Sequence, residues 1–191
     1  MALETLGVIG TMTTTKRIGL LMGSFDPMHV GHLNMIRQIL SNDLVDKVVI
    51  VPCFQNPWKK NHPASFDDRI EIIKKEVEWF GKMVDVSNIE TSIEPPYYSY
   101  KSLSALRKEY PEDELYIICG TDVADKIHLW KNYDDDIRPY FGVIVVDRTD
   151  SEGGIKISST QIREMLKDGK EVYPYVPENA LKYILENKIY D

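Results

Sequence analysis

Short runs of apolar residues alternate along the chain with longer stretches in which apolar residues recur at helical spacing. The short runs predict buried strands, because a strand covered on both faces carries no polar alternation. The longer stretches place their apolar side chains on one face, as amphipathic helices do. The predicted strands are 18–22, 48–51, 84–86, 115–119 and 141–146, and the predicted helices are 31–40, 66–80, 98–110, 159–167 and 177–187.

This alternation of strands and helices is typical of a parallel sheet that is covered by helices on both faces. We therefore predict a three-layer, Rossmann-like α/β domain over residues 16–191, with a small helical portion at its C-terminal end. Residues 1–15 are expected to be a poorly ordered leader outside this domain, with Met12 as an alternative start. Ligands bind beyond the carboxyl ends of strands in such sheets. The candidate functional positions are thus those just after Met22, Val51, Cys119 and Val146.

The composition is that of an ordinary globular protein, with 43% hydrophobic and 28% charged residues over 191 positions. A net charge of −7, from 23 basic and 30 acidic residues, argues against a nucleic-acid-binding protein. No apolar run approaches the ~20 residues of a membrane span. Cys53 and Cys119 form neither a disulfide framework nor a metal-ligand pattern, so a reducing, cytoplasmic compartment is expected. The oligomeric state stays open, and a homo-oligomer is possible.

The loop after the first predicted strand carries the strongest chemical signal, Gly-Ser-Phe-Asp-Pro-Met-His-Val-Gly-His over residues 23–32. His29 and His32 are three positions apart at the start of a helix, so both can face one ligand and donate to phosphate oxygens. Gly31 lets a phosphate approach the backbone, and the helix N-terminus offers N–H donors. Either histidine alone is also compatible with a cap, a packed side chain or a surface loop residue.

A second group of polar residues lies near the C-terminus, Ile-Ser-Ser-Thr-Gln-Ile-Arg over residues 157–163. It places three hydroxyls at a helix start and Arg163 one turn inside. The hydroxyls can cap the helix while its first N–H groups and Arg163 receive phosphate. Taken alone, such a run of hydroxyls is usually a simple cap.

Together these two segments resemble the HxGH and ISSTxxR motifs of the nucleotidyltransferase superfamily, and the first is most similar to that of bacterial nicotinate mononucleotide adenylyltransferases. The resemblance implies a nucleotidyltransferase-type fold and catalytic roles for His29, His32, Lys59 and Arg163. It also implies that ATP is bound by residues of both motifs and of two later loops. These are Gly23, Ser24, Phe25, His29, Gly31, His32, Gly120, Asp122, Arg148, Ile157, Ser158, Ser159, Thr160 and Arg163.

Four intermediate segments are similar to further elements of that family. Residues 56–59 resemble its P-P-H-K element, with Trp58 in place of the usual histidine, and residues 96–102 resemble P-S-Y-T-x-x-T, with serines in place of the threonines. Residues 120–122 match G-x-D, and Arg148 matches an arginine after the fourth long strand. For the pyridine nucleotide the resemblance implies Ser24, Lys59, Tyr98, Ser99 and a stacking Trp130.

Simpler interpretations of these positions remain open. Lys59 can be a solvated loop residue, with Lys60 as an alternative cation, and Asp122 can be a plain helix N-cap. Trp130 can be a core or surface residue. Arg69, which corresponds to a family arginine, can form a surface pair with a neighbour such as Glu71.

The implied reaction is adenylyl transfer from ATP to nicotinate mononucleotide, which gives deamido-NAD and pyrophosphate. The acceptor phosphate is already a nucleophile, so catalysis is expected to be positioning and charge stabilisation, with Mg²⁺ arriving on ATP. No metal site is expected in the protein, and 134–136 is interpreted as a solvated helix start. The alternatives are nicotinamide mononucleotide or another acceptor such as phosphopantetheine, and, in a different class, a non-catalytic nucleotide sensor.

Overall fold

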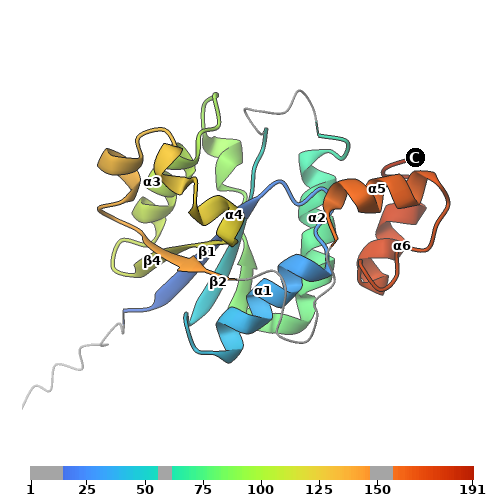
Figure 1. Ribbon diagram of the computed structural model, residues 1–191, viewed down its shortest axis with the longest axis horizontal. Helices are drawn as coiled ribbons and strands as arrows, with labels where there is room; N and C mark the ends of the chain where they lie inside the picture. Colours follow the sequence, from blue (N-terminus) through green and yellow to red (C-terminus); the bar gives the residue numbers. More distant parts are fainter. Residues whose placement is uncertain (1–14, 56–61, 147–156) are drawn as a thin grey trace, which may run out of the picture.

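The computed structural model describes residues 15–55, 62–146 and 157–191 (Figure 1). The predicted leader, the segment that contains Trp58, Lys59 and Lys60, and Arg148 lie outside these residues.

A five-stranded parallel sheet forms the centre of the described structure, in the order β3-β2-β1-β4-β5. Its strands are β1 (Arg17–Gly23), β2 (Lys47–Pro52), β3 (Val84–Val86), β4 (Glu114–Cys119) and β5 (Gly142–Val145). In the central strand, Leu21 pairs with Ile50 of β2 and with Ile118 of β4. The strand order changes direction at β1, so the carboxyl ends of β1, β2 and β4 open onto one crevice.

Helices cover both faces of this sheet. The helices are α1 (Val30–Ser41), α2 (Phe66–Val77), α3 (Ser99–Glu109), α4 (Thr121–Ala124), α5 (Ser159–Lys167) and α6 (Glu178–Glu186). Leu21 packs in one apolar cluster with residues of α1 and α2, whereas its neighbour Leu20 packs in another with residues of α3. Because successive strand residues point to opposite faces, these two clusters are the two halves of a three-layer α/β core. The predicted fold class is confirmed.

The C-terminal helices α5 and α6 form a third apolar cluster at one end of the molecule (Figure 1, orange to red). Ile162 of α5 and Ile184 of α6 are completely buried there, together with Ile72 of α2. This packing brings the second polar motif beside the loop that follows β1.

Two predicted elements differ from the structure. The helix predicted over 66–80 ends as an α-helix at Val77 and continues as a 3-10 segment, η1 (Glu78–Met83), that contains Gly81 at a positive φ of 56°. The fourth long strand is not buried on both faces. It lies at the sheet edge as β5, where Val143 and Val145 alternate with less exposed neighbours and are 38% and 50% exposed.

The sequence pattern did not predict several short segments between β3 and β5. They are α4, η2 (Ile89–Ser92) and η3 (Ile127–Leu129), whereas the π-helical turn η4 (Tyr133–Ile137) lies where a helix start was predicted. Segments of three to five residues are too short for a periodic apolar pattern to develop. No helix among the described residues has the length and apolar character needed to cross a membrane.

Candidate active site

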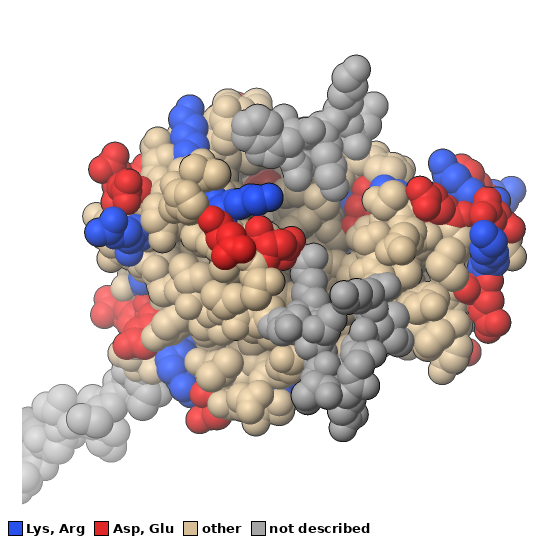
Figure 2. Space-filling view, viewed as in Figure 1, with Lys and Arg blue, Asp and Glu red and all other residues tan. Residues whose placement is uncertain are grey.

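A cavity of about 740 Å³ opens at the carboxyl ends of β1, β2 and β4. Both polar motifs contribute to its wall, the first through His29 and His32 and the second through Ser158 and Arg163. On the face of the molecule that Figure 2 shows, the basic and acidic side chains of the described residues are interspersed and form no continuous basic patch. The site therefore suits a small anionic ligand held by converging donors better than a polyanion.

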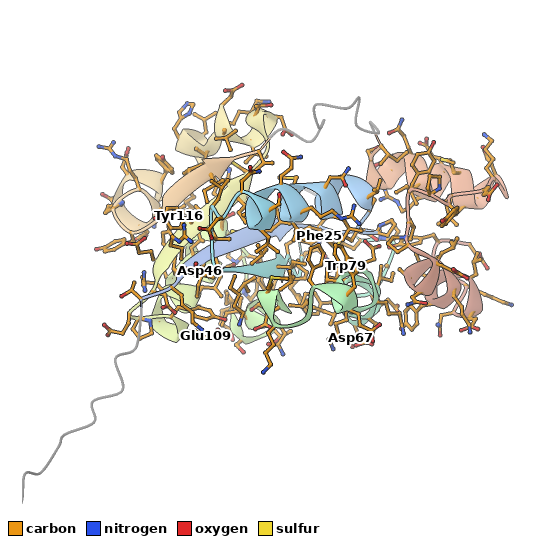
Figure 3. The ribbon with its side chains drawn as sticks, turned by 90° about the horizontal axis from the view of Figure 1, so that it is seen from below. Phe25, Asp46, Asp67, Trp79, Glu109 and Tyr116 are labelled. Atoms are coloured by element: carbon orange, nitrogen blue, oxygen red, sulfur yellow. The ribbon has the colours of Figure 1, made fainter. Side chains whose placement is uncertain are left out.

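The two histidines of the first motif form a reciprocal cap at the start of α1. His29 is the N-cap residue, and its Nδ1 accepts from the backbone N–H of Gly31 at 3.2 Å. The Nδ1 of His32 accepts from the backbone N–H of His29 at 3.3 Å. The two rings lie 3.9 Å apart between centroids, and Phe25 meets the ring of His32 edge-on under α1 (Figure 3). The capping interpretation is confirmed, whereas His29 is buried and is not a surface loop residue.

This cap fixes which nitrogen of each imidazole points away from the helix. Because both Nδ1 atoms accept a hydrogen bond, each neutral ring carries its hydrogen on Nε2. Both residues line the cavity, and the Nδ1 hydrogen bonds fix the orientation of each ring there. Donors that are already oriented stabilise charge on a phosphoryl group without reorganisation.

The backbone N–H groups at this helix start are occupied, in contrast to our prediction that they are available to a phosphate. Val30 donates to the carbonyl oxygen of Tyr175 at 2.9 Å, Gly31 to His29, and His32 to the carbonyl oxygen of His29 at 2.8 Å. The cap consumes the donors that a bare helix N-terminus would offer.

Gly31 has a further reason to lack a side chain besides the predicted close approach of a ligand. A Cβ atom at this position would lie 3.1 Å from both Cε1 and Nδ1 of His29. Such a contact is tighter than ordinary packing and would push the imidazole off its cap. The glycine therefore keeps His29 in place.

The second motif contacts the first directly. Arg163 donates from Nη1 to the backbone carbonyl oxygen of Asp26 at 2.5 Å, and the Ser159 hydroxyl donates to that of Pro27 at 2.8 Å. Ser158 is the N-cap of α5 and accepts from the N–H of Gln161 at 3.3 Å, as the simpler interpretation predicts. The hydroxyls of this motif thus build the site, and Arg163 both joins the two motifs and lines the cavity.

Arg69 of α2 is completely buried, so the surface pair with Glu71 is wrong. Its guanidinium donates to the backbone carbonyl oxygens of Ser24 at 2.7 Å, Cys53 at 2.8 Å and Phe54 at 3.1 Å. These carbonyls belong to the loops after β1 and β2. Arg69 therefore joins the loop after β1 to the loop after β2 from a buried position on α2.

Asp26 anchors the first loop to the C-terminal end of the chain. Its carboxylate accepts from the Tyr190 hydroxyl at 2.8 Å and from the backbone N–H of Ala64 at 3.3 Å, and it lies 3.3 Å from Nδ1 of His62. Burial alone raises the pKa of Asp26, but the hydrogen bonds from His62 and Tyr190 and the charge of Arg163 outweigh it. The pKa of Asp26 therefore lies below its ordinary value. Neither His62 nor Tyr190 follows from the sequence motifs.

The cavity lining also includes residues predicted for the pyridine nucleotide. Tyr98, Ser99 and Trp130 all line it. Lys131 places its Nζ 4.6 Å from the centroid of the Tyr98 ring, a cation–π contact that the sequence did not indicate. Asp122 is exposed on α4, where Gly120 is the N-cap, so the capping interpretation of Asp122 is wrong.

A buried carboxyl that sequence reasoning missed closes one side of the cavity. Glu90 of η2 accepts from the backbone N–H of Phe54 at 2.6 Å and from the Ser102 hydroxyl at 2.7 Å. Burial raises the pKa of Glu90 above its ordinary value, against the opposing effect of Ser102. Ser102, a serine of the threonine-rich element, is therefore a structural residue.

The described residues hold no group of three or more His, Cys, Asp or Glu side chains that could bind a metal ion. Asp134 and Asp135 are exposed in the first turn of η4, as expected for a solvated helix start.

Comparisons with known proteins agree on one family. A model of the cytidylyltransferase-like family matches residues 20–165. A relative from Methylacidiphilum infernorum, named "Probable nicotinate-nucleotide adenylyltransferase", is 33% identical and the match covers 93% of this chain and 94% of the relative. The nicotinate-nucleotide adenylyltransferase of Bacillus subtilis is 30% identical, with 92% and 99% covered.

Solved structures share the fold. The nicotinic acid mononucleotide adenylyltransferase of Plasmodium falciparum, complexed with NaAD, superposes with a TM-score of 0.72 over 92% of this chain and 98% of its own, at 19% identity. A second structure of that protein, complexed with APC, gives a TM-score of 0.69. With both motifs on one cavity and relatives at 33% identity over nearly the whole chain, this protein belongs to the cytidylyltransferase-like nucleotidyltransferases and, within them, to the nicotinate-nucleotide adenylyltransferase family.

Proposed function

We propose that this enzyme transfers the adenylyl group of ATP to nicotinate mononucleotide, giving deamido-NAD and pyrophosphate in cytoplasmic NAD biosynthesis. The supporting observation is the direct contact between the two motifs, in which Arg163 and Ser159 hold the backbone of the loop that leads into His29. Two imidazoles and one guanidinium thereby face a single cavity.

The reaction needs positioning and charge stabilisation more than acid–base chemistry. The 5′-phosphate of the mononucleotide attacks the α-phosphorus of ATP in line, and pyrophosphate leaves. The Nε2–H donors of His29 and His32 hydrogen-bond the phosphate oxygens on which charge develops, with His32 as the main contact. Arg163 and the start of α5 bind the β- and γ-phosphates.

Mg²⁺ enters as part of the ATP complex in this proposal. Mg²⁺ prefers oxygen ligands and keeps several waters, so triphosphate oxygens supply most of its coordination and the ion neutralises their charge. The cavity wall described above is rich in donors to phosphate, which fits a ligand whose metal is held by the triphosphate itself.

The two nucleotides are assigned to different residues of the cavity lining. We assign ATP to Gly23, Ser24, Phe25, Gly31, Gly120, Asp122, Ile157, Ser158 and Thr160 as well as to the histidines and Arg163. Trp130 stacks on the pyridine ring, and Tyr98 and Ser99 line its pocket. Lys59 and Arg148, which lie outside the described residues, remain proposed contacts for the mononucleotide phosphate and for ATP.

The test is pyrophosphate release by the purified full chain with Mg-ATP and one acceptor at a time. We expect rapid release with nicotinate mononucleotide and slower release with nicotinamide mononucleotide or phosphopantetheine. A higher kcat/KM with either alternative acceptor would overturn the acceptor but retain the chemistry. ATP binding without pyrophosphate release for any acceptor would instead indicate a nucleotide sensor.

A further inference from the structure

The side chains of Cys53, His62 and Asp26 form a connected row, with Cys53 and His62 in the connection from β2 to α2 and Asp26 in the connection from β1 to α1. Cys53 directly follows β2, and its Sγ lies 3.8 Å from Nε2 of His62. Nδ1 of the same imidazole lies 3.3 Å from Oδ2 of Asp26. A thiol, an imidazole and a carboxylate thus stand in the order that activates a nucleophile in other proteins.

The surroundings of Asp26 decide where the imidazole carries its hydrogen. Hydrogen bonds and nearby positive charge keep the pKa of this carboxyl low despite its burial, so it is ionised at neutral pH. An ionised carboxylate only accepts, and Nδ1 of His62 must therefore be its donor. Nε2 is then the nitrogen that faces the thiol and can take its proton.

Two further groups favour a thiolate at Cys53. The hydroxyl of Ser24 lies 3.6 Å from Sγ and can donate to a negatively charged sulfur. The guanidinium of Arg69 donates to the carbonyl oxygen of Cys53 itself, at 2.8 Å, and brings a fixed positive charge close to it. Neighbouring cations and hydrogen-bond donors are what lower the pKa of reactive cysteines.

The thiol is also within reach of small molecules. Cys53 is partly exposed and lines the 740 Å³ cavity, whereas Cys119 at the end of β4 is buried, with 5% of its surface exposed. The backbone N–H of Cys53 donates to the carbonyl oxygen of Gly23 at 2.9 Å, which fixes the thiol beside the loop of the first motif. A group attached to Sγ would occupy space in the cavity.

We propose that Cys53 is an activated thiol and a covalent modification site for small, soft electrophiles that enter the cavity. With iodoacetamide as the probe, the Cys53 thiolate forms an S–C bond as the C–I bond breaks and iodide leaves. The proton that Sγ gave up resides on Nε2 of His62 and passes to solvent. No oxidant or cofactor takes part, and the rate is measured without turnover, so the inference is independent of which nucleotides the cavity binds.

The charged groups that surround this row set the expected pH dependence. Asp26 contacts His62 directly, and Glu90 of η2 interacts with it electrostatically. Arg69 of α2, Arg163 of α5 and the Tyr190 hydroxyl at the chain end face Asp26 or Cys53. Arg69 and Arg163 stay charged throughout the accessible range, the pKa of Asp26 is lowered and that of Tyr190 is raised, so Glu90, whose pKa is raised by burial, is the one named neighbour that can titrate beside the Cys53–His62 pair.

The test is the rate of iodoacetamide alkylation of the native full chain, resolved for each cysteine by peptide mass spectrometry. At pH 7 we expect Cys53 to react at least about 10-fold faster than Cys119 and than a free thiol of ordinary pKa. We expect the midpoint of the rate–pH profile of Cys53 to lie at least one unit below the ordinary value of ~8.5. A midpoint at or above ~8.5 in the native protein would overturn the proposal without any variant.

Two variants separate activation from mere exposure. His62→Asn is expected to raise the midpoint towards ~8.5 and to lower the rate at pH 7, since the proton acceptor is gone while Ser24 and Arg69 remain. His128→Asn, at an exposed histidine of η3, is the matched control and should leave both quantities unchanged. Circular dichroism checks that His62→Asn is folded. An unchanged profile in folded His62→Asn would show that His62 does not activate the thiol.

Discussion

The guanidinium of Arg163 donates to the backbone carbonyl oxygen of Asp26 across 137 positions of sequence, at 2.5 Å. This hydrogen bond fixes the start of α5 against the loop that leads into His29. Because Arg163 donates here to a backbone oxygen and not to a carboxylate, the positive charge of its guanidinium is not neutralised, and its other N–H groups can still donate to a ligand in the cavity. The distance between the two motifs therefore depends on Arg163.

Replacing Arg163 should impair the reaction through both of its roles. We expect Arg163→Met to lower kcat/KM by about 10²-fold or more, the typical loss when one charge-stabilising donor is removed. Arg163→Lys should recover part of this activity, because a lysine keeps the charge but not the planar fork. Lys167→Met, an exposed cation one turn further along α5, is the control. Equal effects of Arg163→Met and Lys167→Met on pyrophosphate release would contradict the assignment.

His32 is expected to affect kcat more than stability. His32→Ala removes the Nε2–H donor, and we expect kcat to fall by about 10²–10³-fold. The same change removes one half of the reciprocal cap on α1, which should lower the free energy of unfolding by about 1 kcal/mol. Steady-state pyrophosphate release and urea unfolding measure the two effects. His128→Ala should change neither, and near-wild-type turnover of His32→Ala would refute the proposed role.

Trp130 should affect binding of the mononucleotide alone. Stacking on an aromatic ring contributes about 1 kcal/mol, so Trp130→Ala should raise KM for nicotinate mononucleotide by about 5-fold to 10-fold. Trp130→Phe should retain part of the effect, and KM for ATP should stay the same. Trp79→Ala, at a tryptophan of η1 that is 58% exposed, is the control. A rise in KM for ATP alone would show that Trp130 contacts ATP and not nicotinate mononucleotide.

Arg69 should matter first for stability. Arg69→Met leaves three partly buried carbonyl oxygens without this donor, and each such loss costs about 1–3 kcal/mol where water does not replace the donor. We expect the free energy of unfolding to fall by roughly 3 kcal/mol or more in urea titrations. Lys74→Met removes an exposed cation from the same helix and should cost less than about 0.5 kcal/mol. Similar stabilities for these two variants would show that the loops hold together without Arg69.

Glu76 is a source of pH-dependent instability. This carboxyl of α2 is completely buried, neither of its oxygens has a hydrogen-bond partner among the described residues, and burial raises its pKa well above the ordinary 4.5. Above pH 4.5 the unfolded chain loses this proton while the folded chain retains it, so stability falls as the pH rises towards the folded pKa.

The variant Glu76→Met is therefore expected to be stabilising. The gain in the free energy of unfolding should be larger at pH 8 than at pH 4.5. At pH 8 the unfolded wild-type chain is stabilised by ionising Glu76, whereas burial opposes that ionisation in the folded chain. Glu78→Met, an exposed glutamate two positions later, is the control. Urea titrations at the two pH values measure the difference, and a gain that is independent of pH would exclude the ionisation as its cause.

The edge strand shows how far the apolar pattern could be used to predict the fold. The pattern of 141–146 does predict a strand, and β5 forms at Gly142–Val145. It cannot reveal that this strand lies at the edge of the sheet, where Val143 and Val145 are left exposed. Exposure depends on which elements cover a face, and this is a property of the assembled layers.

The candidate site also contains residues that the sequence predicted and residues that it did not. The residues of the two motifs were predicted because their chemistry is local, as a cap and a phosphate-binding group at a helix start. The structural roles of Arg69, Tyr190 and Glu90 were not predicted, because each of these residues bonds to backbone or side chains far away in sequence.

The sequence by itself determined the layered α/β fold, the family and the two motifs whose residues line the cavity, since these depend on short-range periodicity and on side chains at fixed spacing. Only the tertiary structure decided that the first N–H group of α1 donates to the carbonyl oxygen of Tyr175 and that Cys53 lies beside His62. The physical reason is that hydrogen bonds and burial depend on distances in space, which become short only after the chain has folded.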